Sequence, residues 1–240
     1  MLNVFKKTDD AIIALADFFV ACANEAISKN GRFSVALSGG SSPKKLYELL
    51  ASDAYKTKID WTKVYFFFGD ERYVAKDHAD SNYLMAKTSI LDALAIPENQ
   101  IYSIDTDLDP ASAAQDYQRC ICNYFGSDDT CFDLILLGLG DDAHTASIFP
   151  GTSLVWIDEE FVKEVYLEDK EVYRISFTAP LINLANNVAF LTFGANKAEA
   201  IKAVFEADKD VAKYPAQLIK PSHGTLKWFV DEAAVAQLTK

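Results

Sequence analysis

Short, almost continuously apolar segments alternate along the chain with longer segments of helical apolar spacing, and this alternation constrains the fold most strongly. The predicted buried strands are residues 33–37, 64–68, 132–137, 188–193 and 226–230. The predicted helices are residues 9–29, 44–50, 82–94, 111–125 and 196–206, with a further helix at the C-terminus. Strands that are apolar on both faces and alternate with helices are typical of a mostly parallel sheet covered on both faces. The pattern therefore predicts an α/β fold.

Local signals add detail to this prediction. Residues 162–167 and 172–177 are two strand-like runs joined by a four-residue charged turn, which predicts a β-hairpin. Asp9 and Asp10 can cap the first helix, and Pro43 suits the first turn of the second. Because no repeat, low-complexity tract or linker divides the chain, we expect one domain over residues 1–240.

The charge balance restricts the partners. The chain carries 35 acidic and 23 basic residues, a formal net charge of −12. A broad nucleic-acid-binding face needs clustered Lys and Arg, so we expect no nucleic-acid partner. The sequence also lacks about 20 uninterrupted apolar residues and the features of a signal peptide, so we expect a cytoplasmic protein without a membrane partner. We expect a monomer or a weak homo-oligomer.

Ligands of parallel α/β folds bind at the carboxyl ends of the strands. Four segments occupy such positions here: residues 39–42, 70–72, 138–144 and 194–197. The first belongs to the sequence SGGSSP between a strand and a helix, where backbone amides and a helix N-terminus can face an anion. A plain strand-to-helix turn is the alternative, and the Walker P-loop spacing is absent.

The third segment is a glycine-containing turn that ends in a histidine. Gly138, Gly140 and Ala143 fit the spacing G-x-G-x-x-[GA], but Asp141 and Asp142 would place two negative charges where a dinucleotide pyrophosphate should lie. We therefore expect no nucleotide cofactor. His144 follows directly, and an imidazole beside carboxylates that can orient it is suited to act as a general base.

Other charged residues permit two interpretations. Asp70, Glu71 and Arg72 end an aromatic strand, either as a solvated turn or with their charges directed into a cleft. Arg174 lies on the more polar face of its strand, as surface decoration or as a phosphate-binding cation. The four cysteines and three histidines match no usual zinc spacing, so we expect reduced thiols and no metal site.

Taken together, these segments resemble the 6-phosphogluconolactonase family, which is related in fold to glucosamine-6-phosphate deaminases and ribose-5-phosphate isomerases. The similar stretches cover nearly the whole chain in the family's order: ALSGGSSPKKLYELL (36–50), FFGDERYVAKDHADSN (67–82), FDLILLGLGDDAHTASIFPGT (132–152), YRISFTAPLINLANNVAFLTFGANKAEAI (173–201) and PAQLIKPSHGTLKWFVDEAA (215–234). HTASIFP is specific to the lactonases, and the deaminases have D-E-Y where this chain has Asp70, Glu71 and Arg72.

The resemblance implies a Rossmann-like α/β fold, hydrolysis of 6-phospho-D-glucono-1,5-lactone in the oxidative pentose phosphate pathway, and no cofactor. The expected catalytic residues are His144 as the base, Asp142 to orient its ring and Arg72 to stabilise the oxyanion. The residues expected to bind the substrate and its phosphate are Gly39, Gly40, Ser41, Ser42, Asp70, Arg174 and Lys197. Lys197 matches the family pattern G-x-x-K-A.

One position departs from the family pattern, because Ala143 stands where the family usually has glycine. We expect Asp141 or Asp142 to cap a short helical turn through His144 and Ser147, with a negative φ at Ala143. Two alternative functions stay open. One is a sugar-phosphate deaminase or isomerase of the same fold, in which Asp70 would move a proton. The other is a non-catalytic sugar-phosphate sensor.

Overall fold

A computed structural model describes residues 1–126 and 130–239, and within these residues the strands form two sheets. The larger sheet has six parallel strands in the order β1-β9-β8-β5-β2-β3, and the smaller one has the order β4-β7-β6. The strands are β1 (Leu2–Phe5), β2 (Phe33–Leu37), β3 (Val64–Phe68), β4 (Asp70–Arg72), β5 (Leu134–Leu137), β6 (Val162–Leu167), β7 (Val172–Phe177), β8 (Asn187–Thr192) and β9 (Thr225–Asp231). The predicted α/β fold with a mostly parallel sheet is confirmed, and one domain over residues 1–240 stays a prediction.

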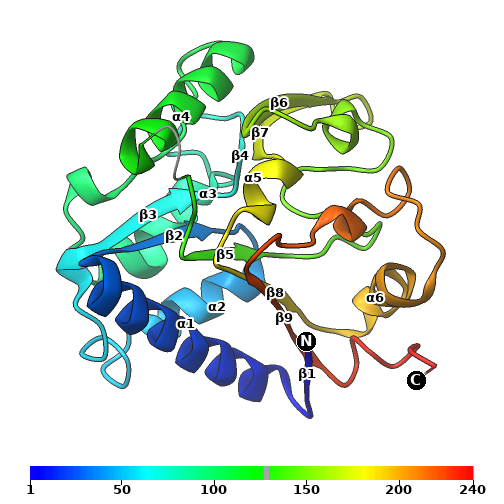
Figure 1. Ribbon diagram of the computed structural model, residues 1–240, viewed down its shortest axis with the longest axis horizontal. Coiled ribbons are helices and arrows are strands. Elements are labelled where there is room, and N and C mark those ends of the chain that lie inside the picture. Colours follow the sequence, from blue (N-terminus) through cyan, green and yellow to red (C-terminus); the bar gives the residue numbers. More distant parts are fainter. Residues whose placement is uncertain (127–129, 240) are drawn as a thin grey trace.

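The helices cover both faces of the larger sheet (Figure 1). They are α1 (Thr8–Asn30), α2 (Ser41–Leu50), α3 (Asn82–Ala86), α4 (Pro110–Phe125), α5 (Ala179–Asn183) and α6 (Ala198–Glu206), and a π-helical turn, Lys87–Leu91, extends α3. Helices α1 and α2 lie on one face. The smaller sheet, α4 and α5 lie on the other face, where α4 packs on strands β6 and β7.

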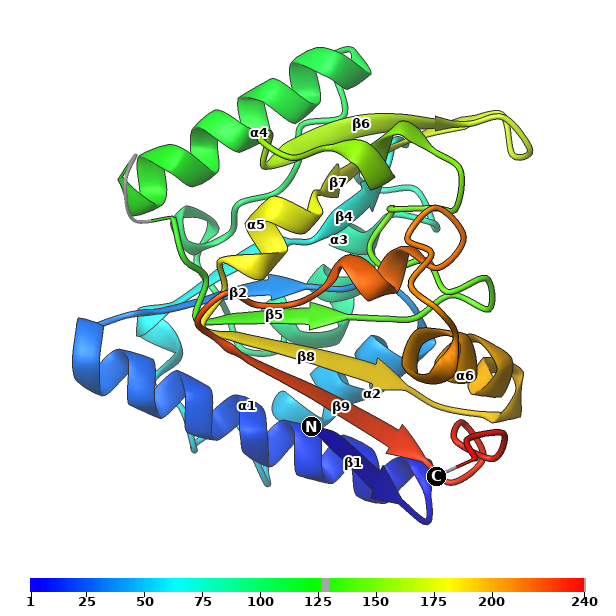
Figure 2. The same cartoon turned by 45° about the vertical axis from the view of Figure 1, so that its right-hand side comes forward.

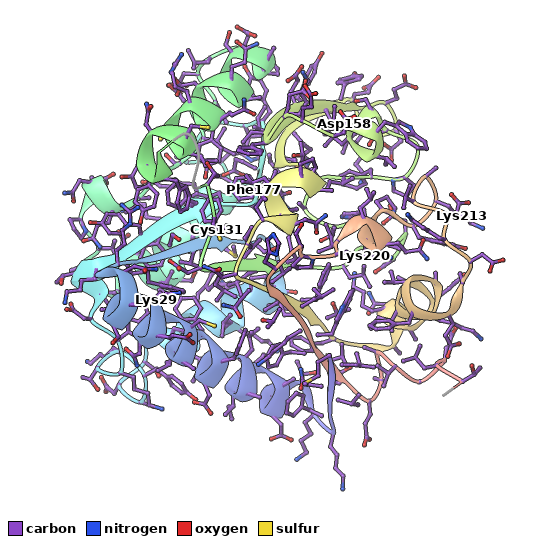
Figure 3. The ribbon with its side chains drawn as sticks, in the orientation of Figure 1. Lys29, Cys131, Asp158, Phe177, Lys213 and Lys220 are labelled. Carbon is purple, nitrogen blue, oxygen red and sulfur yellow. The ribbon has the colours of Figure 1, made fainter. Side chains whose placement is uncertain are left out.

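Alternation along the central strands divides the core into two clusters. On β2, Val35 faces a cluster with side chains of α1 and α2, whereas Ala36 faces the cluster formed with α4 and the smaller sheet. All residues of β2 and β5 are buried, as expected for parallel strands covered on both faces. Phe177, labelled in Figure 3, lies at the end of β7. It connects the layers, because its ring packs on those of Tyr117 and Phe132.

Helix α1 is the longest helix of the described chain. Its length and its mean hydropathy of 1.6 would suffice for a membrane span. Eight of its residues are buried in the core, however, and the Phe19 ring meets that of Phe33 on β2 at 5.4 Å. Helix α1 therefore packs as a core helix. Its N-cap is Lys7, so the prediction that Asp9 or Asp10 caps it is wrong; both lie in the first turn, where their charge favours the helix dipole.

Two other predicted elements differ. Helix α2 begins at Ser41, three residues before the predicted start, with Pro43 inside its first turn. The predicted C-terminal helix is wrong, because residues 232–237 form successive turns after β9. Asp231 explains the difference: its carboxylate accepts hydrogen bonds from the backbone N–H of Ala234 and Gly194, which holds the chain in a turn beside β8.

The parallel arrangement brings the expected site segments to one edge. Strands β2, β5, β8 and β9 all end on the same side of the molecule (Figure 2). The predicted hairpin of β6 and β7 is confirmed, with Leu167 opposite Val172 at its turn. Strand β4 pairs with β7, which attaches the hairpin to the segment that follows β3.

Candidate active site

A cavity of about 350 Å³ lies at the carboxyl ends of the parallel strands. Its walls come from the segments after β2, β3, β5 and β8 and from the β6–β7 hairpin. The lining residues that carry polar side chains are Ser38, Asp70, Arg72, Asn82, His144, Ser147, Lys170, Arg174 and Lys197. Gly39, Gly40, Gly138 and Gly140 bring the backbone to the same cavity.

His144 and Asp142 form a hydrogen-bonded pair at the wall of this cavity. Asp142 Oδ1 lies 2.5 Å from His144 Nδ1 and accepts the His144 backbone N–H at 3.1 Å. Burial alone would raise the pKa of Asp142, but its hydrogen bond and charge interaction with His144 outweigh burial and lower the pKa to about 2. Because Asp142 is therefore ionised at neutral pH, it accepts a hydrogen bond from the Nδ1–H group of His144, which leaves Nε2 as the unprotonated ring nitrogen.

The His144 ring is held tightly on other sides. It stacks on the Phe149 ring with 4.0 Å between centroids and an interplanar angle of 28°. At Gly140, a Cβ atom would lie 2.0 Å from His144 Nδ1 and 2.6 Å from Asp142 Oδ1. Glycine is therefore required at position 140 for the pair to form in this geometry.

The turn that carries the pair differs from the predicted one. Ala143 has a φ of 63°, so the expected negative φ is wrong, and residues 140–144 form a turn rather than a short helix. The Gly140 N–H donates to the His144 carbonyl at 2.8 Å, and the Ala143 N–H donates to the Gly140 carbonyl at 3.1 Å. The Asp142 carboxylate bonds to both the backbone N–H and the ring of His144, two residues later. The left-handed conformation of Ala143 turns the chain so that both bonds can form.

Asp70 is the first residue of β4 and is buried in the cavity wall. Its Oδ2 accepts a hydrogen bond from Ser147 Oγ at 2.7 Å. Asn82 donates to the Asp70 carbonyl at 2.8 Å and, more weakly, to Oδ1 at 3.3 Å. A Cβ atom at Gly39 would lie 2.0 Å from Asn82 Oδ1, so this glycine gives room for the amide.

Glu71, between Asp70 and Arg72, has a structural role. Its buried carboxylate accepts backbone N–H groups from Arg72, Asn82 and Tyr83. Burial raises the pKa of Glu71, while these hydrogen bonds oppose the rise. Glu71 thus anchors the start of α3, and only Asp70 and Arg72 of this charged triplet line the cavity.

Arg72 and Arg174 face each other directly across the β4–β7 pair. Arg72 Nη1 donates to the Asp80 carbonyl at 2.6 Å. Within the described residues, Arg174 Nε and Nη1 are buried and have no hydrogen-bond partner. Burial, and then the charge of Arg72, lower the pKa of Arg174. Two like charges opposite each other destabilise a strand pair, and buried unpaired donors are costly, so this arrangement favours an anion in the cavity.

Lys197 completes the expected set of cations. Its Nζ lies 2.5 Å from Asp141 Oδ1, and Asn196 donates to the same oxygen at 3.1 Å. Ser41 and Ser42 lie elsewhere, because they line a neighbouring hollow with Thr8 and Lys45 at the start of α2. The structure thus groups most of the predicted site residues around one cavity, with Asp142 behind His144 and with these two serines outside it.

Several cavity residues were absent from the sequence-based set. Ser147 and Phe149 belong to the family-specific stretch HTASIFP, so the motif itself was an available signal. Asn82 ends the matching segment that contains Asp70, but its contact with Gly39 depends on how two distant segments pack. Lys170 lies in a turn among acidic residues, a pattern that gave no reason to place it in a site.

The fold and the site define an α/β protein with a cationic cavity at the carboxyl edge of a parallel sheet and a histidine–aspartate pair in its wall. The sequence matches the family described as glucosamine-6-phosphate isomerases/6-phosphogluconolactonase over residues 6–228. The chain belongs to this family, as its motifs predicted.

Individual relatives are similar over nearly the whole chain. A 6-phosphogluconolactonase from a Nostoc species is 42% identical over 234 residues, which cover 95% of each chain. One from a Synechocystis species is 43% identical over 214 residues, covering 88% of this chain and 86% of the relative. The solved structure of 6-phosphogluconolactonase from Trypanosoma cruzi is 26% identical, with a TM-score of 0.87, and the match covers 100% of this chain and 97% of the other.

The left-handed conformation of Ala143 leads to a stability prediction. Ala143 and Ala86 are both buried, but Ala86 has a helical φ of −65°. Replacing either with glycine loses one buried methyl group and frees the unfolded chain, whereas only Ala143→Gly relieves left-handed strain of about 1–2 kcal/mol. In urea unfolding, Ala143→Gly should therefore retain about 1–2 kcal/mol more stability than Ala86→Gly. Equal losses in the two variants would show that Ala143 is not strained.

Proposed function

We propose that this protein hydrolyses 6-phospho-D-glucono-1,5-lactone to 6-phospho-D-gluconate, a step of the oxidative pentose phosphate pathway. One observation carries the proposal: an ionised Asp142 orients His144 in a cavity that also holds Arg72 and Arg174 without carboxylate partners among the described residues. A base beside unpaired cations suits attack of water on the carbonyl of an anionic ester. The names of the relatives from Nostoc and Synechocystis support the same substrate.

The reaction begins with the imidazole. Nε2 of His144 removes a proton from a water molecule as the water oxygen adds to the lactone carbonyl carbon. The resulting imidazolium is stabilised by the Asp142 carboxylate at Nδ1. The stack on Phe149 and the close fit at Gly140 keep the ring in one orientation, so little reorganisation accompanies proton transfer.

Addition of water produces a tetrahedral oxyanion, and Arg72 is the residue we assign to its stabilisation. The bond from the carbonyl carbon to the ring oxygen then breaks, and the imidazolium returns its proton to that oxygen. The products are a hydroxyl group and a carboxylic acid, which loses its proton to solvent. One water is consumed and His144 is regenerated neutral, so the cycle needs no cofactor.

The phosphate group is assigned to the other cations and to the glycine-rich turn. Arg174 offers buried donors that are unpaired within the described chain, and Lys197 contributes an ammonium group that Asp141 orients. Gly40, with a φ of 111°, exposes its backbone to the cavity beside the first turn of α2. Ser41 and Ser42 stay candidate phosphate ligands that would have to act from the adjoining hollow.

The assay that tests this function uses freshly generated 6-phosphogluconolactone, since gluconolactones also open spontaneously. The protein should accelerate ring opening well above the background rate without release of ammonia from glucosamine 6-phosphate. Ammonia release instead would support the deaminase alternative, in which Asp70 moves the proton. Binding of the sugar phosphate without turnover of either compound would support a sensor.

We also place the protein in the cytoplasm, acting on a small-molecule substrate without nucleic-acid or membrane partners, as a monomer or a weak homo-oligomer. The net charge of −12 supports the absence of a nucleic-acid partner, because phosphate backbones would be repelled.

Replacing the base tests the mechanism. His144→Ala should reduce kcat for 6-phosphogluconolactone by about 10²–10⁴-fold, the usual contribution of a general base. The side chain is only partly buried and its removal leaves the strands intact, so circular dichroism should report an unchanged fold. Near-normal turnover by the folded variant would remove His144 from the mechanism.

Gly140 offers a test of ring positioning that leaves His144 in place. Gly140→Ala forces the added methyl against the imidazole and the Asp142 carboxylate, which should lower kcat by at least about tenfold through misplacement of the base. Gly138→Ala is the matched control, because its nearest contact would be Ser38 Oγ at 3.8 Å. Equal activity of the two variants would contradict the steric account.

A further inference from the structure

Lys170 lies in the turn of the β6–β7 hairpin and lines the same cavity as His144. Its Nζ is 4.8 Å from the centroid of the Phe149 ring, a cation–π contact. Phe149 in turn stacks on His144. The lysine therefore extends from an exposed turn to the mouth of the cavity, on the side where the base is held.

Lys170 lines the cavity although its neighbours in sequence are acidic. Glu168, Asp169 and Glu171 adjoin it in the turn. Nevertheless, within residues 1–126 and 130–239, no carboxylate lies within the 4.0 Å ion-pair distance of its ammonium group. By contrast, Lys163 on the same hairpin forms an ion pair, with 3.4 Å between its Nζ and Glu160 Oε1.

Two of the other three cavity cations already have polar partners. Lys197 is paired with Asp141, and Arg72 donates to the Asp80 carbonyl. Arg174, four positions after Lys170 on the same hairpin, is half-buried in the wall with unpaired donors. A phosphate monoester carries about two negative charges near neutral pH. Because Asp141 already offsets the charge of Lys197, this lysine and Arg174 together leave part of the phosphate charge unmatched.

The net charge of −12 adds a kinetic difficulty, because the protein as a whole repels an anionic substrate. A cation at the mouth of a cavity raises the local concentration of anions and their rate of entry. Lys170 is exposed, has no carboxylate partner among the described residues, and lies at the mouth of this cavity.

We propose that Lys170 is a substrate-capture residue, which binds the phosphate group of the substrate at the cavity mouth and, with Arg174, confers preference for a phosphorylated lactone. This inference rests on the proposed function. It assigns to the hairpin turn a role in specificity, while the chemistry stays with His144 and Asp142.

The test compares Lys170→Ala with Lys163→Ala, a matched loss of one lysine from the same hairpin. With 6-phosphogluconolactone at low ionic strength, Lys170→Ala should raise KM by about tenfold and change kcat by less than about twofold, since an unmatched charge acts mainly on binding. Lys163→Ala should leave both parameters within about twofold of the wild type, because exposed ion pairs contribute little. Raising the salt concentration to about 0.5 M should shrink the effect of Lys170→Ala.

The unphosphorylated glucono-1,5-lactone separates phosphate capture from a general effect on the site. Its kcat/KM should be nearly equal in the wild type and Lys170→Ala, and Lys170→Arg should restore the KM for the phosphorylated lactone. An active wild type with unchanged KM in Lys170→Ala, or equal losses on both lactones, would overturn the proposal for Lys170 alone.

Failure of the proposed function has a different signature. In that case the wild type would accelerate opening of neither lactone. Inorganic phosphate then serves as the probe: it should raise the Tm of the wild type more than that of Lys170→Ala if the residue captures phosphate. Equal shifts in the two proteins would overturn the capture role independently of catalysis.

Discussion

The hydrogen bond between the Asp142 carboxylate and Nδ1 of His144 determines the form of the whole segment after β5. Asp142 reaches forward over one residue, so Ala143 takes a left-handed conformation and the chain closes back on Gly140. Gly140 must lack a side chain because the imidazole and the carboxylate occupy the space beside it. The stack on Phe149 fixes the remaining freedom of the ring. Local strain is thus placed where it orients a base.

The arrangement of the strands brings the cationic side chains of the site together. Because β2, β3, β5 and β8 are parallel, their carboxyl ends bring the glycine-rich turn, Asp70, His144 and Lys197 to one edge, and pairing of β4 with β7 adds the two facing arginines. An isolated Arg72–Arg174 pair would be repulsive. An anion between the two arginines attracts both and offsets their repulsion, so this geometry favours a phosphorylated ligand. Cations are thereby concentrated in one cavity of an acidic protein.

The sequence predicted what depends on apolar patterning and missed what depends on particular side-chain hydrogen bonds and on tertiary packing. Buried strands were evident because parallel strands are apolar on both faces, and the position of His144 followed from the end of β5. The predicted C-terminal helix failed because the Asp231 carboxylate binds backbone groups of two segments. The helical turn expected at Ala143 does not form, because the Asp142 carboxylate bonds to the His144 ring instead of capping a helix. Asn82 and Lys170 enter the site only through tertiary packing, which no local pattern encodes.

The claim that Asp142 and His144 act as one unit is tested most directly by a double-mutant cycle. Hydrolysis of freshly generated 6-phosphogluconolactone would be measured for Asp142→Asn, His144→Ala and the double variant, each corrected for spontaneous opening. If Asp142 acts only through the imidazole, the double variant should be about as slow as His144→Ala alone. If the two losses multiply instead, Asp142 acts independently of His144, and the account of the pair is contradicted.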